Sequence, residues 1–330
     1  MRSFVIGGAG FIGSHLVERL VERGPVTVFD NLTVGKREFL GSLLTEADRT
    51  PDNPQSHGTL ARVRLVVADA LDFPTLQEAM RGHDIVFHLA ANPEARWGLE
   101  RSRLDLEQGT LATYNALEAA RLAGVQRFVL ASSGTVYGNT PEPCAEQDLG
   151  NLPISLYGAS KLAGEALVSA YVECFGLRAC ILRFGNVVGP RGTHGAILDF
   201  CNKLHAHPEY LDVLGDGRQS KPYVYVTDCT KGLLSVVDHA PEALAVYNLA
   251  PPDSTSVRRL AELCVASSPF PNARIEFGST PQGWPGDVPT SRLIAQKLAA
   301  LGFTLAHSSD EAVAKAVKDI AHQVFVSGVS

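Results

Sequence analysis

The chain has 330 residues, of which 45% are hydrophobic and 19% are charged, and its formal net charge is -6. This length suits one large domain or two smaller ones, and a negative charge without any basic run argues against nucleic acid as a partner. No apolar run is long enough to cross a membrane, and no signal peptide precedes the first strand, so we expect a cytoplasmic protein with no membrane partner.

The cysteines are scattered without the spacing of a metal site, and most of them lie in apolar segments. His205 and His207 are close in sequence but lack evident carboxylate or cysteine partners. We therefore expect no metal. The six cysteines are expected to be reduced and mostly buried: Cys144, Cys174, Cys180, Cys201, Cys229 and Cys264.

The first element is a short apolar run, residues 3–6, which suits a buried parallel strand. A glycine-rich loop joins it to residues 15–21, whose apolar positions have helical spacing. At such a junction Gly7 allows the tight turn, Gly10 lets the backbone approach a pyrophosphate, and Gly13 lets the helix pack close to the sheet. The loop therefore predicts a dinucleotide held at the N-terminus of this helix.

The second apolar strand, residues 26–29, ends in Asp30. This is about the distance from the loop at which an acid bonds the adenosine ribose hydroxyls. An acid here would repel a 2′-phosphate, so NAD is favoured over NADP. A glycine-rich turn and a strand-ending aspartate can also occur without a ligand, but here the strand, loop, helix and acid are all in place.

Strands and helices alternate through the first half of the chain. A polar insert at roughly 45–59 is expected to be a surface loop. Further strands are expected at 63–67, 85–91, 127–131 and 179–184, and helices at 110–123 and 157–175. Repeated units of this kind predict an α/β fold with a Rossmann-type, doubly wound parallel sheet covered on both faces.

Beyond Gly189 the pattern becomes irregular, and helical segments return only at 257–266 and 293–301. We expect a smaller, mixed α/β C-terminal substrate lobe over the carboxyl edge of the sheet, where ligands of such folds bind. The expected NAD-binding domain covers 1–188 with a return segment at about 223–250. The lobe covers 189–222 and 251–330.

Tyr157 and Lys161 are four residues apart at the start of an expected helix, so both side chains point to one face. The ammonium of Lys161 is expected to lower the phenol pKa, and a phenolate near neutrality can take a proton from a sugar hydroxyl. Ser132 and Ser133 end the preceding strand at the same carboxyl edge of the sheet. By itself, a tyrosine and a lysine four residues apart usually belong to a solvent-exposed helix face. Together with the nucleotide-binding loop and the strand-end serine, the pair indicates an acid/base site.

Several further motifs run over nearly the whole chain. They are Asp30-Asn31, His88-Leu89-Ala90-Ala91, Ser132 to Gly138, Asn186 to Arg191, Gly215 to Gln219 and Trp284-Pro285-Gly286-Asp287-Val288. With the glycine-rich loop and the Tyr157/Lys161 helix, they make the chain resemble the extended short-chain dehydrogenases/reductases of the NAD-dependent epimerase/dehydratase family. Within that family it most resembles the UDP-glucose (UDP-galactose) 4-epimerase group.

This resemblance implies roles for particular residues. Ser133, Tyr157 and Lys161 would be catalytic. NAD would be held by Gly7, Gly10, Phe11, Ile12, Gly13, Asp30, Asn31, Asp69, Ala70, Leu89, Ala90, Ala91, Tyr157 and Lys161. The UDP-sugar would be held by Asn186, Arg191, His194, Arg218, Lys221, Tyr223, Trp284, Asp287 and Ser291.

The residues after the catalytic serine distinguish the reactions of this family. The 4,6-dehydratases resemble one another in carrying Asp-Glu there, and the sugar-acid decarboxylases carry a glutamate. This chain has Gly134-Thr135, which offers no ionisable group. The resemblance therefore implies epimerisation at C4 through a transient 4-keto sugar, with NAD regenerated in each cycle.

Three positions depart from the family's pattern. Gly109 stands where an asparagine near the nicotinamide is common. Lys221 replaces an arginine that grips the diphosphate, giving a point charge in place of a fork. Trp284 replaces a second phosphate arginine, for which Arg191 or Arg218 could compensate. Trp284 could itself stack on the uracil or the sugar, or serve as a surface anchor.

Two positions bear on the sugar. Ser291 aligns where 4-epimerases restricted to plain hexoses carry a bulky tyrosine, so UDP-GlcNAc/UDP-GalNAc interconversion is expected beside that of UDP-Glc/UDP-Gal. His194 lies in a glycine-rich loop and could touch the substrate or simply be exposed.

The alanine-rich helices at 110–123 and 157–175 resemble the family's dimer-forming pair, which predicts a homodimer, although the same apolar faces could serve the core alone. Two other functions stay open. One is another nucleotide-sugar epimerase or a reductase of the same family, and the other is a non-catalytic NAD-binding regulatory protein.

Overall fold

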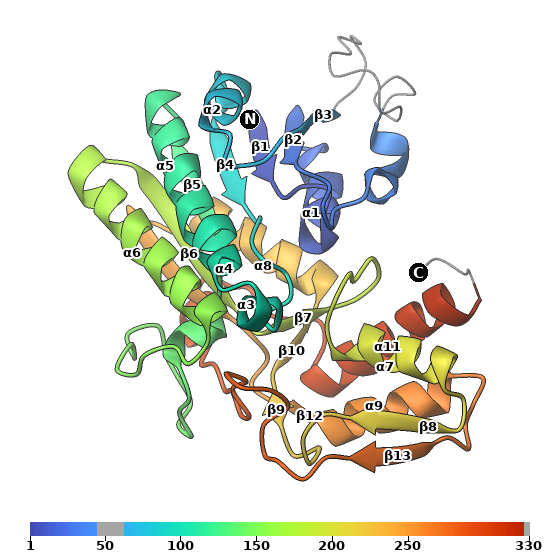
Figure 1. The fold of residues 1–330 in the computed structure, drawn as a ribbon. Helices are drawn as coiled ribbons and strands as arrows, with labels where there is room; N and C mark the ends of the chain where they lie inside the picture. The colour runs from blue at the N-terminus through green and yellow to red at the C-terminus, as the bar shows by residue number, and fades with distance from the viewer. Residues whose placement is uncertain (45–62, 327–330) are drawn as a thin grey trace.

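A computed structural model describes residues 1–44 and 63–326 of the chain (Figure 1). Its centre is a parallel, seven-stranded sheet in the order β11-β6-β5-β4-β1-β2-β3. The strands are β1 (Ser3–Ile6), β2 (Val26–Asp30), β3 (Val63–Val67), β4 (Ile85–His88), β5 (Arg127–Ser133), β6 (Arg178–Phe184) and β11 (Leu244–Leu249). The predicted α/β fold with a Rossmann-type sheet is confirmed.

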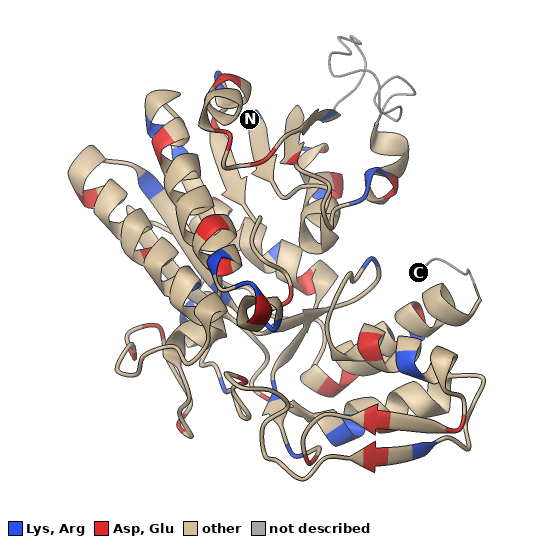
Figure 2. Ribbon diagram, viewed as in Figure 1, with Lys and Arg blue, Asp and Glu red and all other residues tan. Residues whose placement is uncertain are grey.

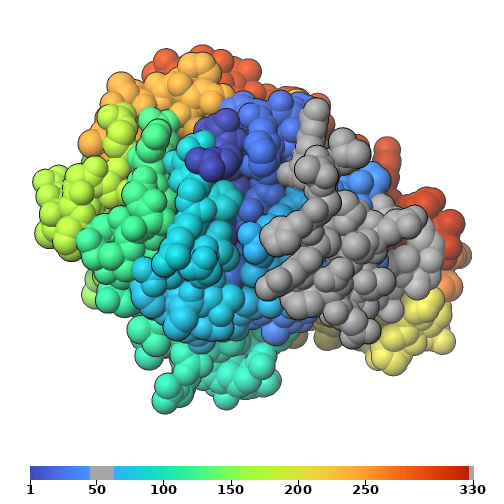
Figure 3. Space-filling model, turned by 90° about the horizontal axis from the view of Figure 1, so that it is seen from above, coloured from blue at the N-terminus to red at the C-terminus, as the bar shows by residue number. Residues whose placement is uncertain are grey.

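Helices cover both faces of this sheet, as its nearly continuous apolar strands require. On one face α1, α8 and α10 pack against the sheet, and on the other α2, α5 and α6 do so. These helices are α1 (Phe11–Leu20), α2 (Phe73–Met80), α5 (Ala112–Leu122), α6 (Leu156–Phe175), α8 (Val226–His239) and α10 (Gln296–Ala300). Figure 3 shows the molecule from above, and the N-terminal half, coloured from blue to green, spreads across the surface seen in that view.

The segment before α5 is less regular than the sequence predicts. Two short helices, α3 (Trp97–Glu100) and α4 (Arg103–Asp105), lead into a π-helical turn at Leu106–Leu111, from which α5 continues. Such turns interrupt the ordinary helical register and often occur at functional sites. The expected helix at 110–123 therefore begins two residues later, at Ala112.

A second lobe with its own apolar core lies beside the carboxyl edge of the sheet (Figure 1). Its helices α7, α9 and α11 pack together and against two paired strands, β8 and β13. Two further strand pairs, β7 with β10 and β9 with β12, lie between this layer and the main sheet. The bounds are β7 (Asn186–Val188), α7 (Ala196–Ala206), β8 (Tyr210–Val213), β9 (Ser220–Lys221), β10 (Tyr223–Tyr225), β12 (Thr255–Ser256), α9 (Val257–Ser267), β13 (Arg274–Phe277) and α11 (Ser309–Phe325).

The expected helix at 293–301 is wrong in its first residues. Leu293 forms an isolated β-bridge with Cys144, and the carbonyl of Cys144 accepts a hydrogen bond from the Ile294 backbone N–H at 2.8 Å. The helix α10 therefore begins only at Gln296.

The predicted division of the chain stays a proposal. It consists of a domain of 1–188 with a return segment at about 223–250, and a lobe of 189–222 and 251–330. The place of β11 beside β6 in the main sheet supports the return segment. The expected surface loop at 45–59 lies outside the described residues. Acidic and basic residues are intermixed along the ribbon (Figure 2). No described helix is long and apolar enough to span a membrane.

Candidate active site

A cavity of about 780 Å³ runs from the carboxyl ends of the central strands to the second lobe. Every residue that the sequence assigns to NAD or to catalysis lines it. The order of the strands explains this arrangement, because β1 lies between β2 and β4, and connections leave the sheet in opposite directions from its centre. A crevice opens at such a point, and ligands of these folds bind there.

The glycine-rich loop has the geometry that a pyrophosphate needs. Gly7 has a positive φ of 80°, and a Cβ atom there would lie only 2.7 Å from the backbone nitrogen of Ala90. Gly13 in the first turn of α1 packs against the carbonyl of Gly7, where no side chain fits. The loop can therefore bring its backbone N–H groups and the helix N-terminus close to an anion, and these residues fit a dinucleotide.

Asp30 at the end of β2 is held in place by the loops around it. Its carboxylate accepts hydrogen bonds from the backbone N–H groups of Ala9, at 3.0 Å, and Leu32, at 2.9 Å. Burial raises its pKa, while these two backbone hydrogen bonds act in the opposite direction. The carboxylate lines the cavity and fits the role of ribose acceptor that the sequence predicts.

Asp69, the second acid expected at the cofactor, lies just beyond β3. It accepts hydrogen bonds from the side-chain amides of Asn31, at 2.8 Å, and Gln108, at 3.3 Å. Gln108 comes from the π-helical turn and was not predicted from the sequence. It therefore ties the start of α5 to the cofactor side of the cavity.

The acid/base candidates meet at the end of β5 and the start of α6. Ser155 caps α6 by accepting a hydrogen bond from the Gly158 backbone N–H at 3.1 Å, which fixes the turn that carries Tyr157 and Lys161. The ammonium of Lys161 lies 5.6 Å from the centre of the Tyr157 ring and donates a 2.8 Å hydrogen bond to the carbonyl of Ala131. The structure thus brings Ser133, Tyr157 and Lys161 to one wall of the cavity.

The electrostatics of this pair differ from the expectation. Desolvation raises the pKa of Tyr157 to about 12, although a hydrogen bond with Ser133 lowers it. Desolvation also lowers the pKa of Lys161 to about 8, against the charges of Asp105 and Glu165. The predicted lowering of the phenol pKa is therefore wrong for the protein chain alone, because removing the phenol from water raises the pKa by more than the Ser133 hydrogen bond lowers it.

The wall behind Ser133 contains a buried ion pair that the sequence analysis did not identify. Arg183 of β6 donates to Glu165 of α6 through both Nε and Nη2, with a shortest distance of 2.7 Å. Glu165 also accepts a 2.5 Å hydrogen bond from the Ser132 hydroxyl, and Arg183 donates to the hydroxyl of Tyr137 at 2.8 Å. This network fixes the end of β5 beside the catalytic candidates.

Gly109 departs from the family's pattern for a steric reason. It lies in the π-helical turn against Ser160 of α6, and a Cβ atom at this position would collide with the Ser160 side chain. An asparagine would therefore not fit here unless α6 or the π-helical turn moved.

The substrate candidates fall into two groups. Seven of them line the cavity: Asn186, His194, Lys221, Tyr223, Trp284, Asp287 and Ser291. Arg191 and Arg218 do not. Arg191 pairs with Glu18 and donates to the Ser14 hydroxyl on α1, and the Arg218 side chain is 89% exposed beside Asp216.

Lys221, which stands in place of a family arginine, is already paired in this structure. Its ammonium lies 2.6 Å from the carboxylate of Asp287, which is buried and also accepts a hydrogen bond from the Gly283 backbone N–H. Lys221 and Asp287 therefore act as one unit beside Trp284 rather than as separate contacts.

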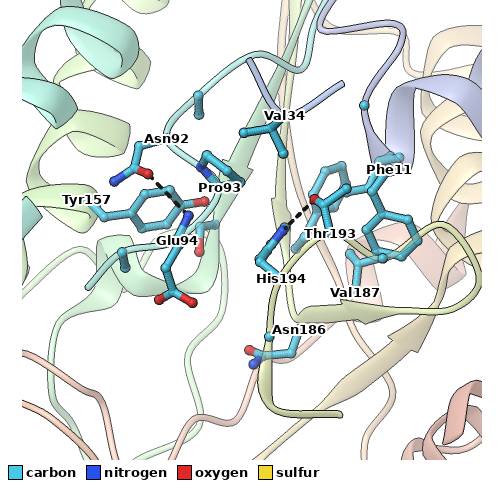
Figure 4. Close-up of a pocket in the computed structure, with 18 of the residues that line it drawn as sticks. Phe11, Val34, Asn92, Pro93, Glu94, Tyr157, Asn186, Val187, Thr193 and His194 are labelled. Carbon is cyan, nitrogen blue, oxygen red and sulfur yellow. Dashed lines mark hydrogen bonds between the residues drawn. The ribbon is translucent and has the colours of Figure 1, made fainter. Parts of the chain in front are cut away.

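Four charged residues of the cavity were missed by the sequence analysis: Glu94, Arg96, Arg101 and Asp199. Glu94 and Arg96 lie in the loop after β4 and line the cavity wall that faces the loop of Thr193 and His194 (Figure 4). Their signal in the sequence was their position just after a strand, at the carboxyl edge of the sheet. Among the described residues no cluster of three or more His, Cys, Asp or Glu side chains could hold a metal ion.

The family model described as the NAD-dependent epimerase/dehydratase family matches residues 3–250. The chain belongs to this family. Because the family is NAD-dependent and the glycine-rich loop and Asp30 fit a dinucleotide, the expected NAD cofactor is confirmed.

Members of the family that resemble this chain carry different activities in their names. A putative UDP-glucose 4-epimerase from Methanocaldococcus jannaschii is 33% identical over 78% of this chain and 80% of its own length. A UDP-N-acetyl-alpha-D-glucosaminuronate decarboxylase from Bacillus cytotoxicus is 31% identical over 79% of this chain and 78% of its own length. A crystal structure of a UDP-galactose 4-epimerase superposes with a TM-score of 0.83 at 37% identity, over 98% of this chain and 100% of the other. The family is therefore established as one of nucleotide-sugar enzymes, while its members differ in their reactions.

Proposed function

We propose that this chain interconverts the C4 epimers of a UDP-sugar and is thus an isomerase. The observation that carries the proposal is that Ser133, Tyr157 and Lys161 lie on one wall of the cavity. In the sequence, Gly134 and Thr135 follow Ser133 directly. Tyr157 and Ser133 can exchange a proton with a sugar hydroxyl, while Gly134 and Thr135 supply no group that could remove water or assist loss of a carboxylate. The 4-epimerases among the similar proteins support the same reaction.

In the proposed reaction, Tyr157 takes the proton of the C4 hydroxyl and Ser133 shares the hydrogen bond to that oxygen. Bound NAD supplies the hydride acceptor, and its positive charge favours the Tyr157 phenolate. The 4-keto sugar then turns in the cavity, and Tyr157 returns the proton when the other face of the sugar is reduced. Lys161 keeps the phenol oriented, because its own position is fixed by the carbonyl of Ala131.

The candidate substrate pair is UDP-glucose and UDP-galactose, with UDP-GlcNAc and UDP-GalNAc as a second pair. The small side chain of Ser291 at the cavity supports the N-acetylated pair. Asn186, Tyr223 and Trp284, together with the Lys221–Asp287 unit, are the proposed contacts of the nucleotide and the sugar. The similar decarboxylase makes another reaction on a nucleotide sugar the second candidate.

The test is to incubate the purified protein, without added cofactor, with UDP-galactose and with UDP-GalNAc, and to identify the products by NMR. Formation of the 4-epimers is the expected result. The matched Tyr157→Phe variant keeps the ring but lacks the hydroxyl, and its rate is expected to fall by roughly 10²- to 10⁴-fold. Absence of any 4-epimer with the unmodified protein would contradict the proposal, and carbon dioxide release from a sugar-acid nucleotide would favour the second candidate.

A homodimer in the cytoplasm is also proposed. Apolar side chains are exposed along the outer face of α5 and α6, including Tyr114 at 45%, Leu122 at 48% and Phe175 at 56% exposure. All six cysteines are free thiols, as expected in a reducing compartment. Sedimentation should give a dimer for the unmodified protein and a monomer for Tyr114→Glu, and an unchanged dimer in this variant would argue against the α5/α6 interface.

A further inference from the structure

The loop after β4 presents a carboxylate to the cavity in a fixed position. The Asn92 side chain accepts a hydrogen bond from the Glu94 backbone N–H at 3.2 Å and donates another to the buried carboxylate of Asp105 at 3.0 Å. Asn92 itself is only 3% exposed. In Figure 4 this loop lies beside Tyr157, and the Glu94 side chain extends from it into the space opposite His194. Glu94 therefore lines the same cavity as the catalytic candidates, on a loop that Asn92 holds in place.

The guanidinium of Arg96 is occupied by Glu94. Arg96 donates to the two carboxylate oxygens of Glu94 through Nε, at 3.0 Å, and Nη2, at 2.9 Å, and its backbone N–H donates to the same carboxylate at 3.2 Å. This is the two-pronged geometry by which arginine binds carboxylates. Burial raises the pKa of Glu94, but the hydrogen bonds and the charge of Arg96 together outweigh it and lower the pKa, so the carboxylate is ionised at neutral pH and is a poor proton carrier.

The residue that faces Glu94 across this space is a histidine. His194 faces Glu94 from the loop after β7 (Figure 4), and desolvation lowers its pKa, although the charge of Glu94 raises it. The ring is therefore neutral at pH 7. A sugar bound between these walls would contact the carboxylate of Glu94, which accepts hydrogen bonds. It would also contact Arg96, whose guanidinium is already hydrogen-bonded to Glu94.

We infer that the Glu94–Arg96 pair restricts this cavity to sugars without a carboxylate. Glu94 accepts hydrogen bonds from an uncharged sugar and keeps the Arg96 guanidinium from binding a sugar carboxylate. The negative charge of Glu94 would also repel such a carboxylate. The inference rests on the proposed function, because it concerns the sugar of the same nucleotide substrate. It makes Glu94 a specificity residue rather than a proton carrier.

The experiment measures the affinities of NAD-loaded protein for UDP-glucose and UDP-glucuronic acid by calorimetry, in a Tyr157→Phe background that prevents turnover. The substitution Glu94→Gln keeps the size of the side chain and removes its charge, which frees the Arg96 fork. The expected result is that the ratio of the two affinities moves toward UDP-glucuronic acid by at least about tenfold, the effect of one charge-assisted hydrogen bond.

Two further variants make the result specific. Adding Arg96→Met to Glu94→Gln should move the ratio most of the way back toward its original value, because the freed guanidinium is then gone and only the loss of the Glu94 charge remains. Glu78→Gln removes the partner of Arg81 in an exposed ion pair on α2 and should leave the ratio unchanged. An unchanged ratio in Glu94→Gln, or the same shift in Glu78→Gln, would overturn the inference.

The proposed function is tested separately, by measuring the turnover of UDP-galactose by protein in which Tyr157 is intact. Absence of turnover together with the expected change in affinity ratio would contradict only the epimerase proposal. Turnover together with an unchanged ratio would contradict only the role of Glu94.

Discussion

The ammonium of Lys161 lies 2.8 Å from the carbonyl oxygen of Ala131, in the strand that ends at Ser133. This hydrogen bond joins the first turn of α6 to the carboxyl end of β5. It therefore helps to set the position of Tyr157 relative to Ser133, because the Lys161 side chain is anchored on the backbone of the strand.

The burial of Lys161 predicts a pH-dependent stability. Its pKa is about 8 in the folded chain and 10.5 in the unfolded one, so between these values the unfolded chain binds more protons and the free energy of unfolding rises with pH. Below about pH 8 both states carry the ammonium and this contribution is constant. We expect the stability of the unmodified protein relative to Lys161→Met to increase from pH 8 to pH 10, measured by urea unfolding of cofactor-free protein. A difference that stays flat or falls over this range would contradict the assignment.

Asp30 is expected to determine the choice of dinucleotide. In Asp30→Ser the repulsion of a 2′-phosphate is lost, so the preference for NAD over NADP, measured as a ratio of dissociation constants, should fall by roughly tenfold or more. Asp84→Ser is a matched control, because Asp84 also accepts a backbone hydrogen bond, from Arg2, but does not line the cavity. Equal effects of the two substitutions on the ratio would argue against a contact between Asp30 and the ribose.

The ion pair of Arg183 and Glu165 is nearly inaccessible, with side-chain exposures of 3% and 6%. Replacing one partner leaves a buried charge without its counterion, so Arg183→Met should lower the free energy of unfolding by about 3–5 kcal/mol. The exposed pair of Arg81 and Glu78 offers a control, since Arg81→Met should cost only about 0–1 kcal/mol. Chemical unfolding at pH 7 compares the two, and similar small losses would show that Arg183 contributes little.

Ser291 is expected to control access of an N-acetyl group. Ser291→Tyr should lower the rate with UDP-GalNAc relative to UDP-galactose by filling space at the cavity wall, whereas Ser291→Ala should leave this ratio unchanged. Competition between the two substrates in one reaction measures the ratio directly. If the tyrosine variant keeps the original ratio, the sugar C2 position does not lie beside this residue.

Local patterns predicted the parts of the site that depend on backbone geometry. The glycine-rich loop, Asp30 and the Tyr157/Lys161 turn were found in the sequence because each is a short motif at the end of a strand or the start of a helix. The network of Ser132, Glu165 and Arg183 was not, because its members come from three separate elements.

Other positions depend on contacts that the sequence does not show. Arg191 and Arg218 were assigned by family pattern, and in this structure they pair with Glu18 and Asp216, so their contact with a substrate stays a prediction. Glu94 and Arg96 lie in a loop without periodicity, and their pairing within this loop was not predicted from the sequence. Burial likewise decided the pKa of Tyr157, which a spacing of four residues does not reveal.

The helix α6 carries Tyr157 and Lys161 in its first turns and Glu165 one turn further on, so any movement of this helix displaces all three together. The loops that carry Glu94, His194 and Ser291 are not part of it. Amino-acid changes in those loops can therefore alter which sugar is accepted while the proton-transfer geometry stays intact. A single scaffold could in this way acquire new substrates in evolution without having to assemble its chemistry again.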